Sequence, residues 1–129
     1  MTTELMYLAL VTTLTALMWV PYILNMIMVR GLKDAVGYPK DPAPLAPWAA
    51  SMKAAHANAV ENLVVMAVLV LIANAIGISN EATAMACQVY LWARIVHLLS
   101  YTARIPWLRT ISFAVGFGCQ LTLAWQILA

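Results

Sequence analysis

The chain has 129 residues, of which 64% are hydrophobic and only 9% are charged, and its formal net charge is +2. Soluble globular domains carry about 25% charged residues, so this composition excludes an ordinary water-soluble domain and is typical of an integral membrane protein. The small net charge also excludes the dense basic face that binds nucleic acid.

A membrane-spanning helix needs about 20 mostly apolar residues, and four stretches meet this requirement. We predict helices over about residues 5–29, 50–76, 82–103 and 107–128, in a single transmembrane domain that covers residues 1–129. The first stretch lacks a basic n-region and is longer than the h-region of a signal peptide, so we expect it to be retained. Pro21 lies inside this stretch and predicts a kink.

The connections between the predicted helices differ in kind. Residues 30–48 contain four prolines and two glycines, which is typical of a turn-rich loop. Residues 77–81 predict a tight hairpin, with Ser79 or Asn80 as the N-cap of the next helix. Lys and Arg occur in the first loop and in the third connection, whereas the hairpin and the termini have none. The positive-inside rule therefore predicts these two loops in the cytoplasm and both termini in the periplasm, in a bacterial inner membrane.

Several polar side chains lie within the predicted spans, where a charged group costs roughly 2.5–3.5 kcal/mol near the bilayer centre. Asn58 and Glu61 are three residues apart and share a face of the second helix. Arg94, His97 and Tyr101 form a stripe along the third helix. Glu61 and Arg94 each lie about ten residues, or about 15 Å, from the predicted cytoplasmic ends of their helices. Their matching depth predicts an intramembrane ion pair.

Arg109, at the start of the fourth helix, enters the same layer and completes a predicted polar, net-basic cavity that opens to the cytoplasm. Guanidinium groups bind carboxylates through two hydrogen bonds, which favours an anionic ligand. The alternative is that the pair of Glu61 and Arg94 only holds helices together, and residue types alone leave both hypotheses open.

The histidines and cysteines indicate no metal site and no disulfide. His56 and His97 are the only histidines, and no nearby cysteine completes a tetrahedral ligand set. Cys87 and Cys119 both lie in apolar runs, where we expect small buried residues.

Three motifs in chain order resemble those of the MAPEG superfamily, the membrane-associated proteins in eicosanoid and glutathione metabolism. Residues 55–62, AHANAVEN, resemble the family pattern Arg/Ala-His-x-Asn-x-x-Glu. Residues 93–101, ARIVHLLSY, are similar to Ala-Arg-x-x-His-x-x-x-Tyr, and residues 106–113, PWLRTISF, to Pro-x-x-Arg-x-x-x-Phe/Tyr. The order of spans and loops matches the family over essentially the whole chain.

The resemblance implies a homotrimer of four-helix protomers that binds glutathione, as cosubstrate, between neighbouring protomers near the cytoplasmic side. It implies a glutathione-dependent transferase or peroxidase-like protein that acts on hydrophobic electrophiles by thiolate attack. By position, the family's glutathione contacts correspond to Arg30, Asn58, Glu61, Arg94, His97 and Tyr101. Arg109 would be catalytic, since a cation near the sulfur lowers the pKa of the thiol, and Thr110 occupies a neighbouring position that has a hydroxyl in some members.

Two positions depart from the family pattern. Ala54 replaces an arginine that glutathione-conjugating members often have, and this loss weakens carboxylate binding. Phe113 replaces a tyrosine that several active members have near the sulfur, which removes a possible donor to the thiolate. Since the superfamily also contains non-enzymatic members, two other hypotheses stay open: a non-catalytic binder of lipids or small molecules, and a purely structural subunit.

Overall fold

The computed structural model describes residues 1–129 and contains helices only. The helices are α1 (Thr3–Leu17), α2 (Trp19–Val36), α3 (Pro47–Ala75), α4 (Glu81–Thr102) and α5 (Pro106–Leu128). α1 and α2 together form one candidate span, and the molecule has 4 spans that are long and apolar enough to cross a membrane. The predicted all-α membrane protein with a four-helix transmembrane bundle is confirmed.

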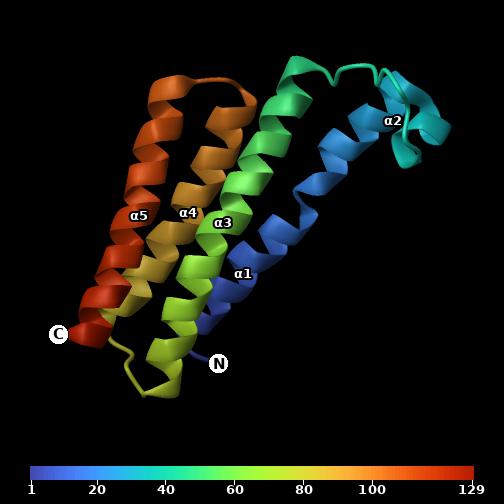
Figure 1. Ribbon diagram of the computed structural model, residues 1–129. Coiled ribbons are helices and arrows are strands. Elements are labelled where there is room, and N and C mark those ends of the chain that lie inside the picture. The colour runs from blue at the N-terminus through green and yellow to red at the C-terminus, as the bar shows by residue number, and fades with distance from the viewer.

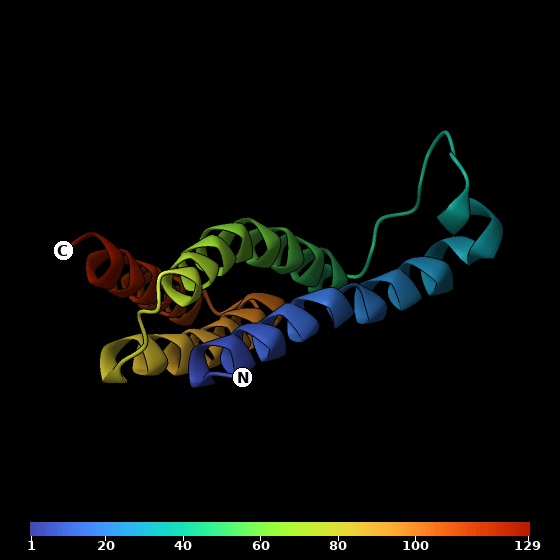
Figure 2. The ribbon, with the colours of Figure 1, turned by 90° about the horizontal axis from the view of Figure 1, so that it is seen from below.

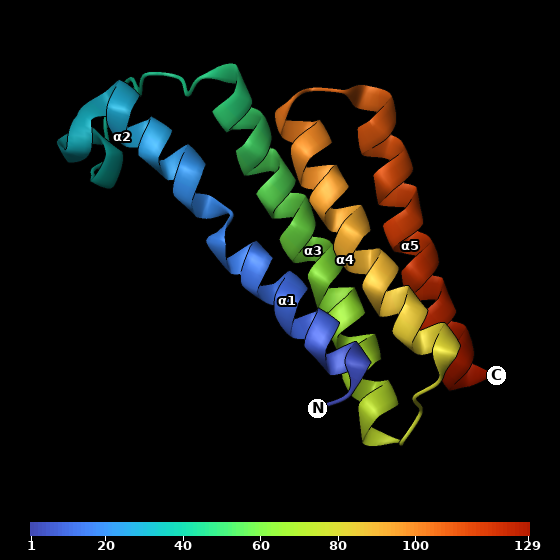
Figure 3. The same ribbon diagram turned by 180° about the vertical axis from the view of Figure 1, so that it is seen from behind.

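The spans α3, α4 and α5 run side by side, and α1 packs against α3 and α4 (Figures 1 and 3). Both termini lie at the same end of the bundle as the α3–α4 turn, and we call this the terminal end. The α2–α3 loop and the α4–α5 turn lie at the opposite end, which we call the loop end. Figure 2 shows that α2 and the loop after it project to one side, away from α4 and α5.

The first span is broken at Met18, as Pro21 predicts. Proline has no N–H to donate to the carbonyl of Leu17, and its ring clashes with that carbonyl. α1 accordingly ends at Leu17, and the N–H of Met18 donates to the carbonyl of Thr15 at 3.4 Å. The kink allows α2 to diverge from α4 while it stays in contact with α3 (Figure 3).

The loop predicted from Arg30 begins later than expected. The backbone turns at Gly31, with φ 77° and ψ 158°, and then forms one more helical turn that ends at Val36. Glycine adopts a positive φ without a steric penalty, so this one residue makes the kink between two helical stretches. Asn25 closes the following loop, because its Oδ1 accepts a hydrogen bond from the N–H of Ala46 at 3.0 Å.

The short hairpin after α3 forms as predicted, with Asn80 as the N-cap of α4. Gly77 has φ 77°, and the N–H of Ile78 donates to the carbonyl of Ala73 at 2.8 Å, which ends α3. The Asn80 side chain accepts from the N–H of Thr83 at 3.0 Å, and the Thr83 hydroxyl accepts from the N–H of Asn80 at 2.9 Å. This reciprocal capping box fixes the start of α4.

The main apolar core lies between α1, α3, α4 and α5. Its buried members are Val11, Met66, Val70, Ala73, Ala86, Cys87, Tyr90, Leu91, Cys119 and Leu123. Cys87 and Cys119 are free and buried, as the apolar runs around them predict. The buried positions of α3 form one seam toward the other helices, and this seam decides which polar residues of α3 face the bundle.

Candidate functional site

Arg94, on α4, is the centre of a buried polar layer between α3 and α4. It is 4% exposed, and its Nη2 donates to Oδ1 of Asn58 at 2.7 Å. The same nitrogen lies 3.3 Å from Nδ1 of His97, and Nε of Arg94 has no partner. Because a guanidinium only donates, Nδ1 of His97 is the acceptor and we assign the ring proton to Nε2. The layer therefore holds a buried cation with neutral acceptors and no carboxylate.

The predicted ion pair of Glu61 and Arg94 does not form within the protomer. Arg94 bonds to Asn58 instead, and Glu61 is exposed on the outside of α3. At 3.6 residues per turn, Glu61 lies about 200° around the helix from Ala59, which faces the bundle. The prediction rested on the equal number of residues from the helix ends and took no account of direction around the helix axis. The hypothesis that this pair ties the helices of one protomer together is wrong for the same reason.

Two amide side chains extend the polar layer to α5. Nδ2 of Asn62 donates to the carbonyl of Asn58 at 2.9 Å and to its Oδ1 at 3.2 Å. Nε2 of Gln120 donates to the carbonyl of Asn62 at 3.2 Å. Sequence reasoning missed Gln120, although an amide in the middle of an apolar helix is a signal that could have identified it.

An open cavity of about 300 Å³ lies beside this layer, toward the loop end. The guanidinium of Arg109 lies 5.0 Å from the ring centroid of Tyr101, within range of a cation–π interaction. No hydrogen bond or ion pair of the protomer engages this guanidinium, so its N–H donors remain available to a ligand. The residues that line the cavity are Asn58, His97, Tyr101, Arg109, Thr110 and Phe113.

A second cavity of about 300 Å³ adjoins the first and shares Tyr101 and Arg109 with it. Ser51 and Arg104 contribute to its wall. Arg104 follows α4 with φ 63°, a conformation that glycine adopts at lower cost. This conformation ends α4, and the N–H of Ile105 donates to the carbonyl of Ser100 at 2.8 Å. The two cavities together place two guanidinium groups on one face of the loop end, where they favour an anion.

Comparison with known proteins supports the motifs and the fold. The model of the MAPEG family matches residues 8–129. The chain belongs to the MAPEG family. No curated protein and no solved structure matches it. The family match and the four spans together identify an integral, multi-pass membrane protein of a family associated with glutathione and eicosanoid metabolism.

The MAPEG protein brings together six of the eight predicted site residues and separates two from them. Asn58, Arg94, His97, Tyr101, Arg109 and Thr110 lie in the polar layer or around the first cavity. Arg30 lines neither cavity, because its Nε donates to the carbonyl of Ala43 at 2.7 Å and so holds the α2–α3 loop. Glu61 faces outward, as described above.

Thr110 and Phe113 line the cavity next to Arg109, and neither offers a free hydroxyl donor to a ligand. The hydroxyl of Thr110 donates to the carbonyl of Pro106 at 3.0 Å, so its proton is already used. Phe113 presents a ring without a hydroxyl, with its centroid 6.4 Å from that of His97. Arg109 is therefore the group at this cavity best able to stabilise a negative charge on sulfur.

Proposed function

We propose that the loop-end cavity binds glutathione and activates its thiol for attack on hydrophobic electrophiles. The observation that carries the proposal is the guanidinium of Arg109, which lines the cavity without an anionic partner. Arg104 offers a second cation next to it, suited to a carboxylate of the tripeptide. The half-buried amide of Asn58 and the buried imidazole of His97 supply neutral polar contacts.

Arg109 has one chemical role in this proposal. It stabilises the thiolate that forms when the glutathione thiol loses its proton to solvent. In conjugation, the thiolate forms a bond to an electrophilic carbon, and the displaced group leaves with the electron pair or the adduct takes a proton from water. With a hydroperoxide, the thiolate sulfur attacks the terminal oxygen, so an S–O bond forms as the O–O bond breaks, and the leaving alkoxide takes a proton from water to become an alcohol. A second glutathione thiol then attacks the sulfur of the resulting sulfenic acid, which forms the disulfide and releases water.

We also propose that the working unit is a homotrimer whose neighbouring protomers cover Glu61. A carboxylate exposed at mid-depth on a membrane-spanning helix is costly unless it finds a partner. A second protomer packed along this side of α3 supplies polar partners for Glu61. It also closes the cavity of Asn58 and Arg109, which is open in the single protomer.

The loop end is proposed to face the cytoplasm. Arg30, Lys33 and Lys40 lie in or next to the α2–α3 loop, and Arg104 lies in the α4–α5 turn, so the basic residues outside the bundle gather at this end. The cytosol also keeps glutathione reduced, which is the form that the reaction needs. In a bacterium, this places both termini in the periplasm.

A specific observation favours a second candidate, a non-catalytic binder of lipids or small molecules. Phe113 has no hydroxyl, and the hydroxyl proton of Thr110 is engaged by the carbonyl of Pro106, so neither of these two positions offers a donor to a thiolate. In this alternative, the same cavity holds an anionic or amphipathic ligand without reaction.

Calorimetry with detergent-purified protein separates these candidates. Glutathione should release or absorb heat on binding and raise the melting temperature, whereas no heat and no thermal shift at millimolar glutathione would exclude the proposal. S-methylglutathione is the matched control, since it keeps both carboxylates but has no thiol. Turnover of a model electrophile with glutathione identifies an enzyme, and binding of both compounds without turnover identifies the non-catalytic binder.

A further inference from the structure

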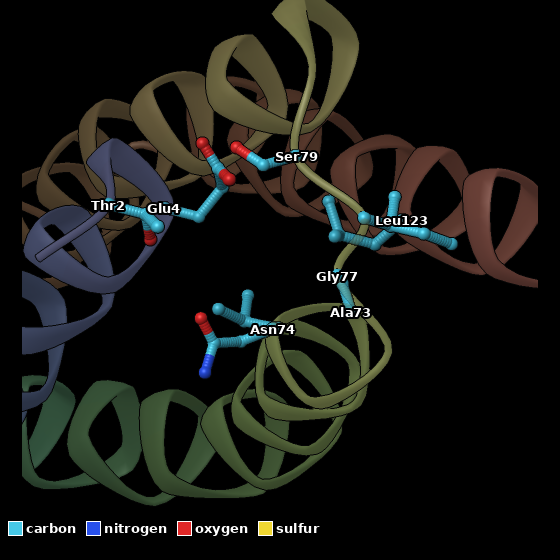
Figure 4. A pocket seen from close by; sticks show the side chains of 9 residues that line it. Thr2, Glu4, Ala73, Asn74, Gly77, Ser79 and Leu123 are labelled. Carbon is cyan, nitrogen blue, oxygen red and sulfur yellow. The ribbon is translucent and has the colours of Figure 1, made fainter.

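A separate cavity of about 220 Å³ lies at the terminal end of the bundle, opposite the proposed glutathione site. It is enclosed by the start of α1, the end of α3, the α3–α4 turn and one residue of α5 (Figure 4). Val70 and Leu123 give it an apolar wall, whereas Thr2, Glu4, Asn74 and Ser79 supply oxygen atoms. It shares no residue with the loop-end cavities, so inferences about it are independent of the proposed function.

The carboxylate of Glu4 is the unusual group in this cavity. Glu4 is 5% exposed, yet no hydrogen bond or ion pair of the protomer engages its side chain. Figure 4 shows this side chain extending from α1 toward Ser79, with the amide of Asn74 on the other side of the opening. The first turn of α1 attracts the negative charge but donates no hydrogen bond to the side chain. The side chain as a whole is nearly buried, while its carboxylate lines the cavity without a protein partner, so a cationic ligand in the cavity would supply the missing counter-charge.

The ligand's size and charge follow from the cavity. A water molecule occupies about 30 Å³ of liquid, so a cavity of about 220 Å³ has room for an organic group rather than a bare ion. A divalent metal is disfavoured, because the molecule has no group of three or more His, Cys, Asp or Glu residues that could hold it. One carboxylate with several neutral oxygens matches a single positive charge that carries several N–H donors.

We propose that this cavity binds a primary alkylammonium group, with Glu4 as the counter-ion and Asn74 and Ser79 as neutral acceptors. The short alkyl stem of the ligand packs against Val70 and Leu123. A quaternary ammonium is excluded because it has no N–H to donate to these oxygens. Two sources share this chemistry, a soluble alkylamine and the headgroup of an aminophospholipid, since the cavity lies at the end of the membrane-spanning helices.

The test measures both sources on the purified full-length chain. Ethanolamine is titrated by calorimetry with choline as the N-methylated control, and native mass spectrometry compares phosphatidylethanolamine with phosphatidylcholine. We expect the primary amine to bind in preference to its N-methylated counterpart in at least one of the two assays. Binding of free ethanolamine identifies a site filled from solution, and selective retention of the lipid alone identifies a headgroup site.

Glu4→Gln should weaken this binding by roughly tenfold or more, because it removes the charge from a hydrogen-bonded pair. Glu81→Gln is the matched control, since Glu81 is also an acidic residue in the first turn of a helix at the terminal end but is exposed. Asn74→Ala changes an exposed side chain and should weaken binding several-fold even if Glu4→Gln lowers the yield of folded protein. Equal binding by wild type and both cavity variants would overturn the proposal, as would the absence of any preference for the primary amine in both assays.

Discussion

The hydrogen bond between Arg94 and Asn58 should contribute strongly to the stability of the bundle, and replacing Asn58 by leucine tests this. Leucine has a similar size but no acceptor, so Asn58→Leu leaves the buried guanidinium without its shortest hydrogen bond. Arg94→Met in the same chain then removes the unpaired charge. The two substitutions and their combination form a double-mutant cycle.

The geometry of this bond sets the expected magnitude. Hydrogen bonds between membrane helices average about 0.6 kcal/mol, whereas hydrogen bonds to charged groups contribute about 1.5–3 kcal/mol. Nη2 of Arg94 lies 2.7 Å from Oδ1 of Asn58, and Arg94 is 4% exposed, so the upper range applies. We expect Asn58→Leu to lower the free energy of unfolding by about 2 kcal/mol, and Arg94→Met to restore most of that loss in the double variant.

Unfolding in mixed micelles, followed by the fluorescence of the 5 tryptophans, measures these free energies. If the two residues are coupled, the double variant is more stable than the sum of the single effects predicts. If the effects instead add to within about 0.5 kcal/mol, Asn58 and Arg94 are not coupled, and their hydrogen bond does not stabilise the bundle as proposed.

Three further substitutions test the site and the assembly. Arg104→Gly should raise the free energy of unfolding by up to about 1 kcal/mol, because glycine tolerates the φ of 63°. The same substitution should weaken glutathione binding in calorimetry, because it removes a cation from the cavity wall. Lower stability would contradict the proposed backbone strain, and unchanged affinity would contradict the proposed contact with glutathione. Glu61→Gln should reduce trimers in chemical crosslinking and weaken glutathione binding, and an unaltered trimer with wild-type affinity would show that no neighbour covers this carboxylate. Phe113→Tyr should speed conjugation of a model electrophile by roughly tenfold, since its hydroxyl can donate to the thiolate, and an unchanged rate would show that the ring lies away from the sulfur.

Hydropathy and single-residue rules predicted much of the fold because they act locally. Apolar length identified four spans, and the break near Pro21 follows from one missing N–H and one steric clash. An N-cap at Ser79 or Asn80 was predicted for the same local reason, and the structure has it at Asn80. Gly31 shows where such rules end, because only the three-dimensional path shows that the helix resumes after it.

The site was harder to predict because it depends on how helices rotate against each other. Depth along a helix follows from a count of residues, and that count placed Glu61 level with Arg94, whereas the side chain that Arg94 contacts is Asn58, three residues nearer the loop end. Direction around the helix follows from the packed seam, which turned Glu61 outward and Asn58 inward. The backbone conformation of Arg104 depends on tertiary packing and has no strong sequence signal. Gln120 stands out in the sequence as an amide in an apolar helix, but its partner, the carbonyl of Asn62, follows only from packing.

The most direct test of the central claim is the ultraviolet absorbance of the glutathione thiolate on the purified protein. Arg109 should stabilise this thiolate, whereas Lys53, an exposed cation on α3 toward the loop end, should not. We predict a thiolate band with wild type and with Lys53→Ala that is lost in Arg109→Ala. A band of equal size in Arg109→Ala, or no band in wild type at saturating glutathione, would contradict the claim that Arg109 activates the thiol.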